Sequence, residues 1–173
     1  MNTQALFNCI FSKLRQEDQE LTQLSGEGIF YAPELYVAIV MGKAIKSNET
    51  EIFNSESRWV RETSFGYGGP TDFAFHVGNT KYVFELKLRD TVHSYINDVQ
   101  KLKSMSDKED AHYEKYFIAL VDSYTHKDEP DGRISSLEQH YPDLRRIAIE
   151  DFETDQTRYE KQIYCNVVMW KVN

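Results

Sequence analysis

Cysteine is scarce in this chain of 173 residues, which has only Cys9 and Cys165, near opposite ends. Neither belongs to a cluster with metal-ligand spacing, so the sequence predicts no disulfide scaffold and no cysteine-bound metal. The five histidines also lack zinc spacing. These absences exclude the small disulfide-stapled and zinc-finger classes of protein.

Long apolar runs are missing as well. No stretch approaches the roughly 20 apolar residues that a membrane-spanning helix needs. The N-terminus has no charged segment followed by an apolar one, which a secretory signal would show. We therefore expect a soluble, cytoplasmic protein without a membrane partner.

The common nucleotide and hydrolase motifs are absent. Gly66, Gly68 and Gly69 precede Pro70, but their spacing matches neither the Rossmann nor the Walker pattern. No Gly-x-Ser-x-Gly elbow is present either. The glycine-rich stretch is thus interpreted as a flexible connection, although glycines permit close approach of a substrate backbone.

Positive charge is in deficit, with 20 Lys and Arg against 28 Asp and Glu, for a net charge of −8. This excludes an indiscriminate nucleic-acid-coating protein, which would normally be basic. It does not exclude a nuclease, since a metal site contributes acids of its own. The stretch 58–103 is close to balanced, so we expect a binding face there.

What is present is enough for one folded domain, residues 1–173, because 40% of the residues are hydrophobic and 13% aromatic. Hydrophobic periodicity predicts an α/β fold with a central mixed β-sheet flanked by helices. The expected helices span about 3–24, 33–46, 92–105 and 135–140. The expected strands span about 59–63, 69–77, 80–88, 116–121, 146–149 and 163–170, and the run 116–121 suits a buried parallel strand.

The stretch 69–88 predicts a β-hairpin, because Gly78-Asn79 is a two-residue type II′ turn signal between two aromatic and β-branched runs. If Val77 and Thr80 flank the turn, Asp72 lies opposite Glu85. Alternation then divides the side chains between two faces. One face is apolar, with Phe73, Phe75, Val77, Tyr82, Phe84, Leu86 and Leu88; the other carries Asp72, Ala74, His76, Lys81, Val83, Glu85 and Lys87.

Two carboxylates directly across a strand pair lie roughly 5 Å apart at Cβ and repel each other. The pairing of Asp72 with Glu85 is understandable if a cation lies between them, and Mg²⁺ is typically held by one or two carboxylates. Lys87 follows on the same face, roughly 7 Å along the strand. The alternative interpretation is a hairpin whose outer face merely happens to be charged.

Asp72 precedes Glu85-Leu86-Lys87 by the length of a hairpin. This arrangement resembles the core of the PD-(D/E)XK nuclease superfamily, also called restriction endonuclease-like. Thr71 lies between Pro70 and Asp72, so the Pro-Asp pair of the family name is not contiguous here. The residue before the acid varies in that superfamily. The resemblance implies a restriction endonuclease-like core in which Asp72, Glu85 and the Leu86 carbonyl hold Mg²⁺ or Mn²⁺. It also implies that Lys87 orients water or neutralises the transition state, and that cleavage leaves a 5′-phosphate.

The resemblance suggests further site residues. Glu34 at the start of the second helix would complete the metal site, with Glu62 as a second choice; a first-turn Glu also simply complements the helix dipole. Gln100 and Lys101 match the place where related nucleases carry a residue that positions substrate or water, and His76 could touch a phosphate. For Gln100, Lys101 and His76 the simpler interpretation is a solvated surface residue, and His93 and Tyr95 are similarly ambiguous.

The favoured function is a magnesium-dependent nuclease that hydrolyses phosphodiester bonds of nucleic acid, with DNA preferred over RNA. The competing hypothesis is a non-catalytic protein of the same fold that binds or regulates within a larger nucleic-acid-processing or defence complex. A third is an unrelated interaction domain with a chance motif. A homodimer or a partner subunit is compatible with each.

Overall fold

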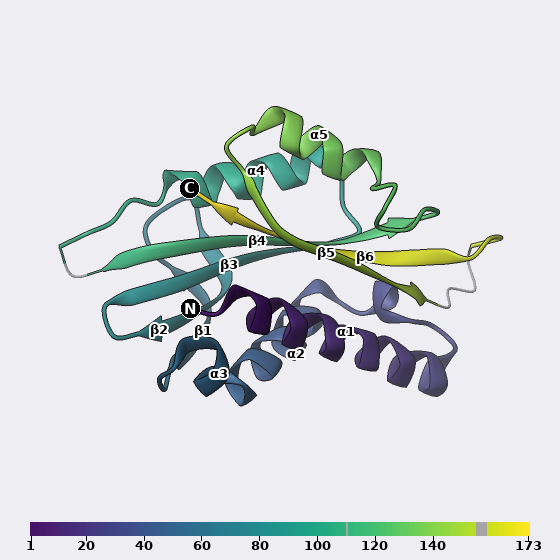
Figure 1. Cartoon of the computed structure of the whole chain (residues 1–173), viewed down its shortest axis with the longest axis horizontal. Helices are drawn as coiled ribbons and strands as arrows, with labels where there is room; N and C mark the ends of the chain where they lie inside the picture. The colour runs from purple at the N-terminus through teal and green to yellow at the C-terminus, as the bar shows by residue number, and fades with distance from the viewer. Residues whose placement is uncertain (110, 155–158) are drawn as a thin grey trace.

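A six-stranded mixed β-sheet lies between two layers of helices in the computed structural model (Figure 1). The structure describes residues 1–109, 111–154 and 159–173. Helices α1, α2 and α3 cover one face of the sheet, and α4 and α5 cover the other. The predicted α/β class with a mixed sheet flanked by helices is therefore confirmed.

The elements follow the expected order along the chain. The helices are α1 Thr3–Ser25, α2 Glu34–Ser47, α3 Glu49–Phe53, α4 Val92–Ser104 and α5 Gly132–His140, with a 3₁₀ turn η1 at Ile29–Tyr31. The strands are β1 Arg58–Ser64, β2 Pro70–Val77, β3 Thr80–Leu88, β4 His112–Ser123, β5 Arg145–Thr154 and β6 Ile163–Val172. Among the described residues, no helix has the length and apolar character needed to cross a membrane.

The strand order across the sheet is β1-β2-β3-β4-β6-β5. Among the described strands only β3 and β4 pair in parallel, and α4 connects them, as the sequence predicts. The predicted hairpin register is also confirmed, because Val77 pairs with Thr80 and Phe73 with Phe84. Gly78 has a φ of +55° while Asn79 does not adopt a positive φ, which is the pattern of a type II′ turn.

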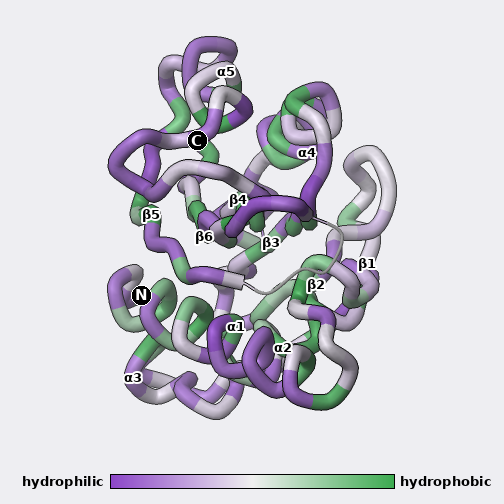
Figure 2. Tube along the Cα trace, turned by 90° about the vertical axis from the view of Figure 1, so that its right-hand side faces the viewer, coloured by the Kyte–Doolittle hydropathy of each residue, from purple (hydrophilic) through white to green (hydrophobic). Residues whose placement is uncertain are grey.

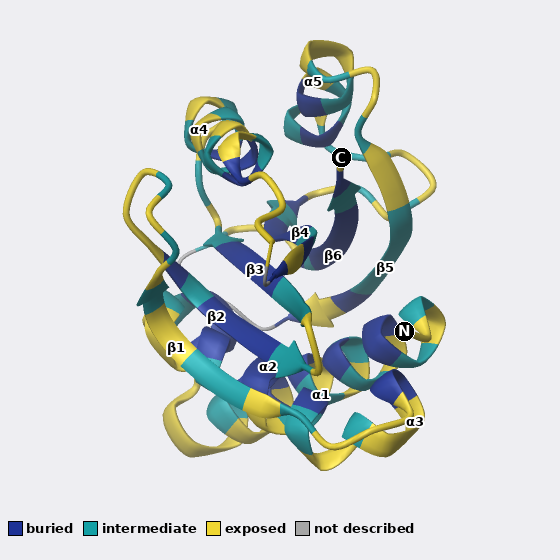
Figure 3. Ribbon diagram, turned by 90° about the vertical axis from the view of Figure 1, so that its left-hand side faces the viewer, coloured by how far each residue is buried: buried dark blue, intermediate teal, exposed yellow. Residues whose placement is uncertain are grey.

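Two hydrophobic cores lie on opposite faces of the sheet. The first, under α1 and α2, contains all seven residues of the predicted apolar face of the hairpin. The second, under α4 and α5, includes Ala74 and Val83 from the other face. Figure 2 shows hydrophobic positions along both the helices and the strands, and Figure 3 shows that the central strands are buried while the edge strands β1 and β5 are more exposed.

Helix α2 departs in part from expectation. Its nearly uninterrupted apolar sequence predicts complete burial, but Leu35 and Tyr36 are 47% and 38% exposed. The helix is covered by the sheet and by α1, which leaves a third side open to water. The short helix α3 has no clear sequence signal, yet its Phe53 packs against Phe75 and Tyr82, at ring-centroid distances of 5.6 and 5.0 Å.

Gly42 marks a close approach of α2 to β1. A Cβ atom placed there would lie 2.1 Å from Cζ2 of Trp59, whose ring stacks on Phe75. We expect Gly42→Ala to lower the free energy of unfolding by about 1–3 kcal/mol, because Trp59 must leave its packed position. Urea denaturation measures this. Gly132→Ala, in α5 with no atom within 4 Å of its added Cβ, is the matched control, and equal stability of the two variants would contradict the packing described.

Candidate active site

Asp72 lies beside the backbone of β3. Its Oδ2 accepts a hydrogen bond of 2.6 Å from the backbone N–H of Leu86, the residue that follows Glu85 in the chain. Burial raises the pKa of Asp72, against the opposing effect of the Leu86 N–H. The hairpin register thus brings Asp72 and Glu85 together near the first residues of β2.

Glu85 is almost completely buried, with 3% of its surface exposed. Its Oε1 lies 2.7 Å from Nζ of Lys101, which comes from α4 and also donates a hydrogen bond of 2.5 Å to the Pro70 carbonyl. Burial and then repulsion from Asp72 raise the pKa of Glu85 to about 8, despite the contact with Lys101. The negative charge at this point is therefore only partly compensated.

Lys87 joins the two helical layers. Its Nζ lies 3.3 Å from Glu34 Oε1 and 3.2 Å from Asp98 Oδ2. Glu34 belongs to α2 and Asp98 to α4, which lie on opposite faces of the sheet (Figure 1). The other oxygen of Glu34 accepts a hydrogen bond of 3.0 Å from the backbone N–H of Leu88. Acids from both helical layers thus contact Lys87 near the C-terminal end of β3.

These residues form what we call the acid–lysine cluster, namely Glu34, Asp72, Glu85, Asp98, Lys87 and Lys101. Burial raises the pKa of Asp98, while the nearby Lys87 opposes that shift. Burial disfavours the charged form of Lys87, but Asp98 and Glu34 outweigh it and raise its pKa. Four carboxyl groups thus share two ammonium groups, which leaves the cluster short of positive charge.

The donor chemistry of the cluster fits a hard divalent cation, which prefers carboxylate and carbonyl oxygen. Asp72 and Glu85 supply such oxygens, and the raised pKa of each indicates room for additional positive charge. Over the described parts of the chain, however, no three His, Cys, Asp or Glu side chains are arranged to hold a metal ion. Lys101 would have to move away from Glu85 to admit one.

Asp98 is the cluster member that the sequence analysis missed. It stands on α4 in a run of mixed polarity, and no motif marks it. The only available signal is its position one helical turn before Lys101, since residues three apart share a helix face. That signal becomes informative only once α4 is known to pack over the Glu85 side of β3.

The structure does not bring every predicted residue into the cluster. Gln100 faces α5, where its Oε1 accepts a hydrogen bond of 3.2 Å from the hydroxyl of Tyr141. His76 lies four residues beyond Asp72 along β2, with its Nδ1 3.1 Å from the guanidinium of Arg58. Glu62, within β1, is exposed and has a φ of +46°.

The two ambiguous residues near the start of α4 separate clearly. Tyr95 is fully buried, with its ring centroid 5.6 Å from that of Phe117, so it belongs to the second hydrophobic core. His93 is exposed on the same helix. Neither is a member of the acid–lysine cluster.

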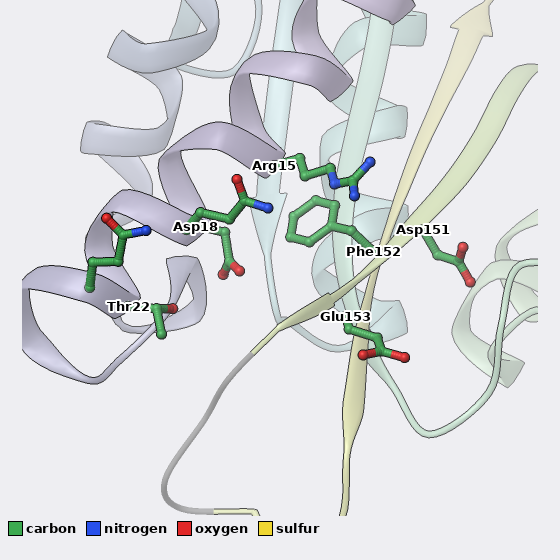
Figure 4. Close-up of a pocket in the computed structure, with 8 residues that line it drawn as sticks. Arg15, Asp18, Thr22, Asp151, Phe152 and Glu153 are labelled. Carbon is green, nitrogen blue, oxygen red and sulfur yellow. The ribbon is translucent and has the colours of Figure 1, made fainter.

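A separate hollow of about 520 Å³ lies between α1 and the edge strand β5 (Figure 4). Two of its acids already have partners: Asp18 accepts from the Ile29 N–H, and Asp151 from the Lys127 N–H. It shares no residue with the acid–lysine cluster. Its lining residues are Arg15, Asp18, Gln19, Thr22, Gln23, Asp151, Phe152 and Glu153.

Comparison with protein-family models, with curated proteins and with solved structures gives no match to this chain. The acid–lysine cluster and its geometry are therefore the indication of function in this protein.

Proposed function

We propose that this protein is a metal-dependent nuclease of the PD-(D/E)XK type that hydrolyses phosphodiester bonds of nucleic acid, with DNA as the preferred substrate. The observation that carries the proposal is the meeting of Glu34, Asp72, Glu85 and Lys87 at one end of the hairpin. Glu34 is 53 residues from Lys87 in the chain. A second acid and a lysine beside the carboxyl groups of Asp72 and Glu85 supply the metal ligands and the positive charge that this chemistry uses.

Asp72 and Glu85 would hold Mg²⁺ or Mn²⁺, with the Leu86 carbonyl and Glu34 completing the ligand set. When bound, such an ion activates water and stabilises the charge that develops on phosphate. Asp72 is already oriented by the Leu86 N–H, so its second oxygen stays available. Glu34 is oriented in the same way by the Leu88 N–H.

Lys87 provides the positive charge that hydrolysis of a phosphodiester needs. Glu34 and Asp98 raise its pKa, so the ammonium group stays protonated throughout the neutral range. The same two carboxylates restrict where Nζ can lie, at 3.3 and 3.2 Å. A preorganised cation of this kind stabilises a negatively charged transition state without reorganisation during the reaction.

The test is incubation of the purified protein with plasmid and with single-stranded DNA in Mg²⁺ or Mn²⁺, beside an EDTA control. We expect metal-dependent cleavage that falls about a hundredfold or more in Asp72→Asn. Lys43→Met, at an exposed position of α2, serves as a control that retains full activity. Cleavage that persists in EDTA or in Asp72→Asn would rule out this site.

One observation favours the second candidate, a non-catalytic binding or regulatory protein of a larger nucleic-acid complex. Lys101 already forms an ion pair with Glu85 and a hydrogen bond to the Pro70 carbonyl, so part of the negative charge of the cluster is neutralised without a metal ion. Titration of the protein with Mg²⁺ in a calorimeter separates the candidates. Metal binding without cleavage indicates that a partner or substrate is missing. The absence of both metal binding and cleavage supports the non-catalytic protein.

A further inference from the structure

A second group of side chains lies on the same side of the sheet as the acid–lysine cluster. We call it the basic–aromatic patch, and its members are Arg58, Phe65, Tyr67, His76, Lys81 and Lys108. Side-chain contacts connect its members: the ring of Phe65 lies 6.1 Å from that of His76, and the Phe65 carbonyl accepts a hydrogen bond of 3.4 Å from Lys108 Nζ.

Each lysine of the patch lies over an aromatic ring. Lys81 Nζ is 5.6 Å from the ring centroid of Phe65, and Lys108 Nζ is 5.3 Å from that of Tyr67. Beneath them, Tyr113 packs edge-on against both rings, at 5.7 and 6.4 Å. The rings are therefore held in place by the buried Tyr113 while Phe65 and Tyr67 stay partly exposed.

The charge of the patch is opposite to that of the chain as a whole. In the part of the chain that the structure describes, no salt bridge joins Arg58, Lys81 or Lys108 to a carboxylate. Asp107, which is next to Lys108 in the chain, is already bonded to His112 and to the Tyr113 N–H. The patch thus holds two exposed cations, Arg58 and Lys108, and the partly exposed Lys81, on a protein with a net charge of −8.

The loop between β1 and β2 connects the patch to the cluster. Tyr67 donates a hydrogen bond of 3.3 Å to the Ser106 carbonyl just after α4. A Cβ atom at Gly68 would lie 3.6 Å from Cγ of Lys101, which contacts Glu85. Figure 3 shows this exposed loop rising beside α4. A ligand on the patch would thus extend along the loop toward the acid–lysine cluster.

From these contacts we infer that the basic–aromatic patch binds a single-stranded segment of nucleic acid and leads it to the acid–lysine cluster. Delivery to the cluster rests on the proposed function, whereas binding at the patch does not. Cations attract the phosphates, and partly exposed aromatic rings stack with unpaired bases. A duplex would present its phosphates to the lysines but no free base face to Phe65 or Tyr67.

The binding experiment uses the full chain, a fluorescein-labelled oligothymidine and a duplex of the same length, with anisotropy recorded in EDTA so that cleavage does not interfere. We expect tighter binding of the single strand. Lys81→Ala should weaken it about fivefold or more and reduce the slope of log K against log salt by about 0.7. Phe65→Leu should weaken it by a similar factor without changing that slope.

Lys43→Ala is the matched control, because Lys43 is exposed on α2 in the other helical layer. Melting temperatures confirm that all variants are folded. The inference is overturned if Lys81→Ala binds like the wild type, if Lys43→Ala weakens binding as much, or if the duplex binds more tightly and Phe65→Leu has no effect. Binding at the patch by a protein that shows neither metal binding nor metal-dependent cleavage would instead contradict the nuclease and leave the patch supported.

Discussion

The Glu85→Gln variant is expected to lose cleavage by about a hundredfold to a thousandfold, and yet to be more stable than the wild type at alkaline pH. The loss follows because Gln lacks the charged oxygen that would hold the metal. The gain follows because the buried Glu85 has a pKa of about 8, raised by burial and by repulsion from Asp72. A neutral amide of the same shape removes that repulsion.

The raised pKa of Glu85 makes the stability of the wild type fall as pH rises. A carboxyl group with a raised pKa in the folded state binds its proton more tightly than in the unfolded chain, where the pKa is about 4.3. The wild type therefore loses stability as pH rises from about 4.3 to about 8 and then levels off. The advantage of Glu85→Gln should be absent near pH 4 and fully developed above pH 8, on the order of a few kcal/mol.

Thermal unfolding at several pH values in EDTA measures this effect, and the cleavage assay measures the loss of activity. Glu51→Gln, at an exposed position of α3, is the control for both. If Glu85→Gln has the same pH dependence of stability as the wild type, the carboxyl group is not buried beside Asp72 as described. If it retains cleavage, Glu85 is not part of the active site.

The Lys87→Met variant is expected to be both inactive and less stable, by about 3 kcal/mol at pH 8, because it leaves Asp98 and Glu34 without their shared cation. Only 20% of the Lys87 side chain is exposed, so water replaces little of the lost interaction. The destabilisation should shrink at acidic pH. The pKa of Asp98 is already raised by burial, and without Lys87 this group takes up a proton more readily as pH falls.

A double variant separates the structural from the chemical role of Lys87. Lys87→Met with Asp98→Asn should recover part of the stability, because the orphaned charge is removed, but should remain inactive. Urea denaturation and the cleavage assay on all four proteins of this cycle give both results. Wild-type stability of the single variant would contradict the ion pairs, and recovery of cleavage in the double variant would reduce Lys87 to a structural residue.

The sequence by itself determined the parts of the fold that depend on local signals. Gly78-Asn79 specified a two-residue turn, and the alternation of side chains then fixed which residues of the hairpin share a face. Turn geometry and the period of a strand act over a few residues, so they are visible without tertiary contacts. The same reasoning located α1, α2, α4 and α5, but not α3, and it gave the parallel pair β3 and β4 from the strand, helix, strand order.

The tertiary structure alone decided which side chains meet at the end of β3. Gln100 and Lys101 are neighbours in sequence, but successive helix positions point about 100° apart, so one faces α5 and the other Glu85. Asp98 joins Lys101 for the same geometric reason. These contacts depend on how α2 and α4 pack onto opposite faces of the sheet, which side-chain volume and shape determine across the whole molecule.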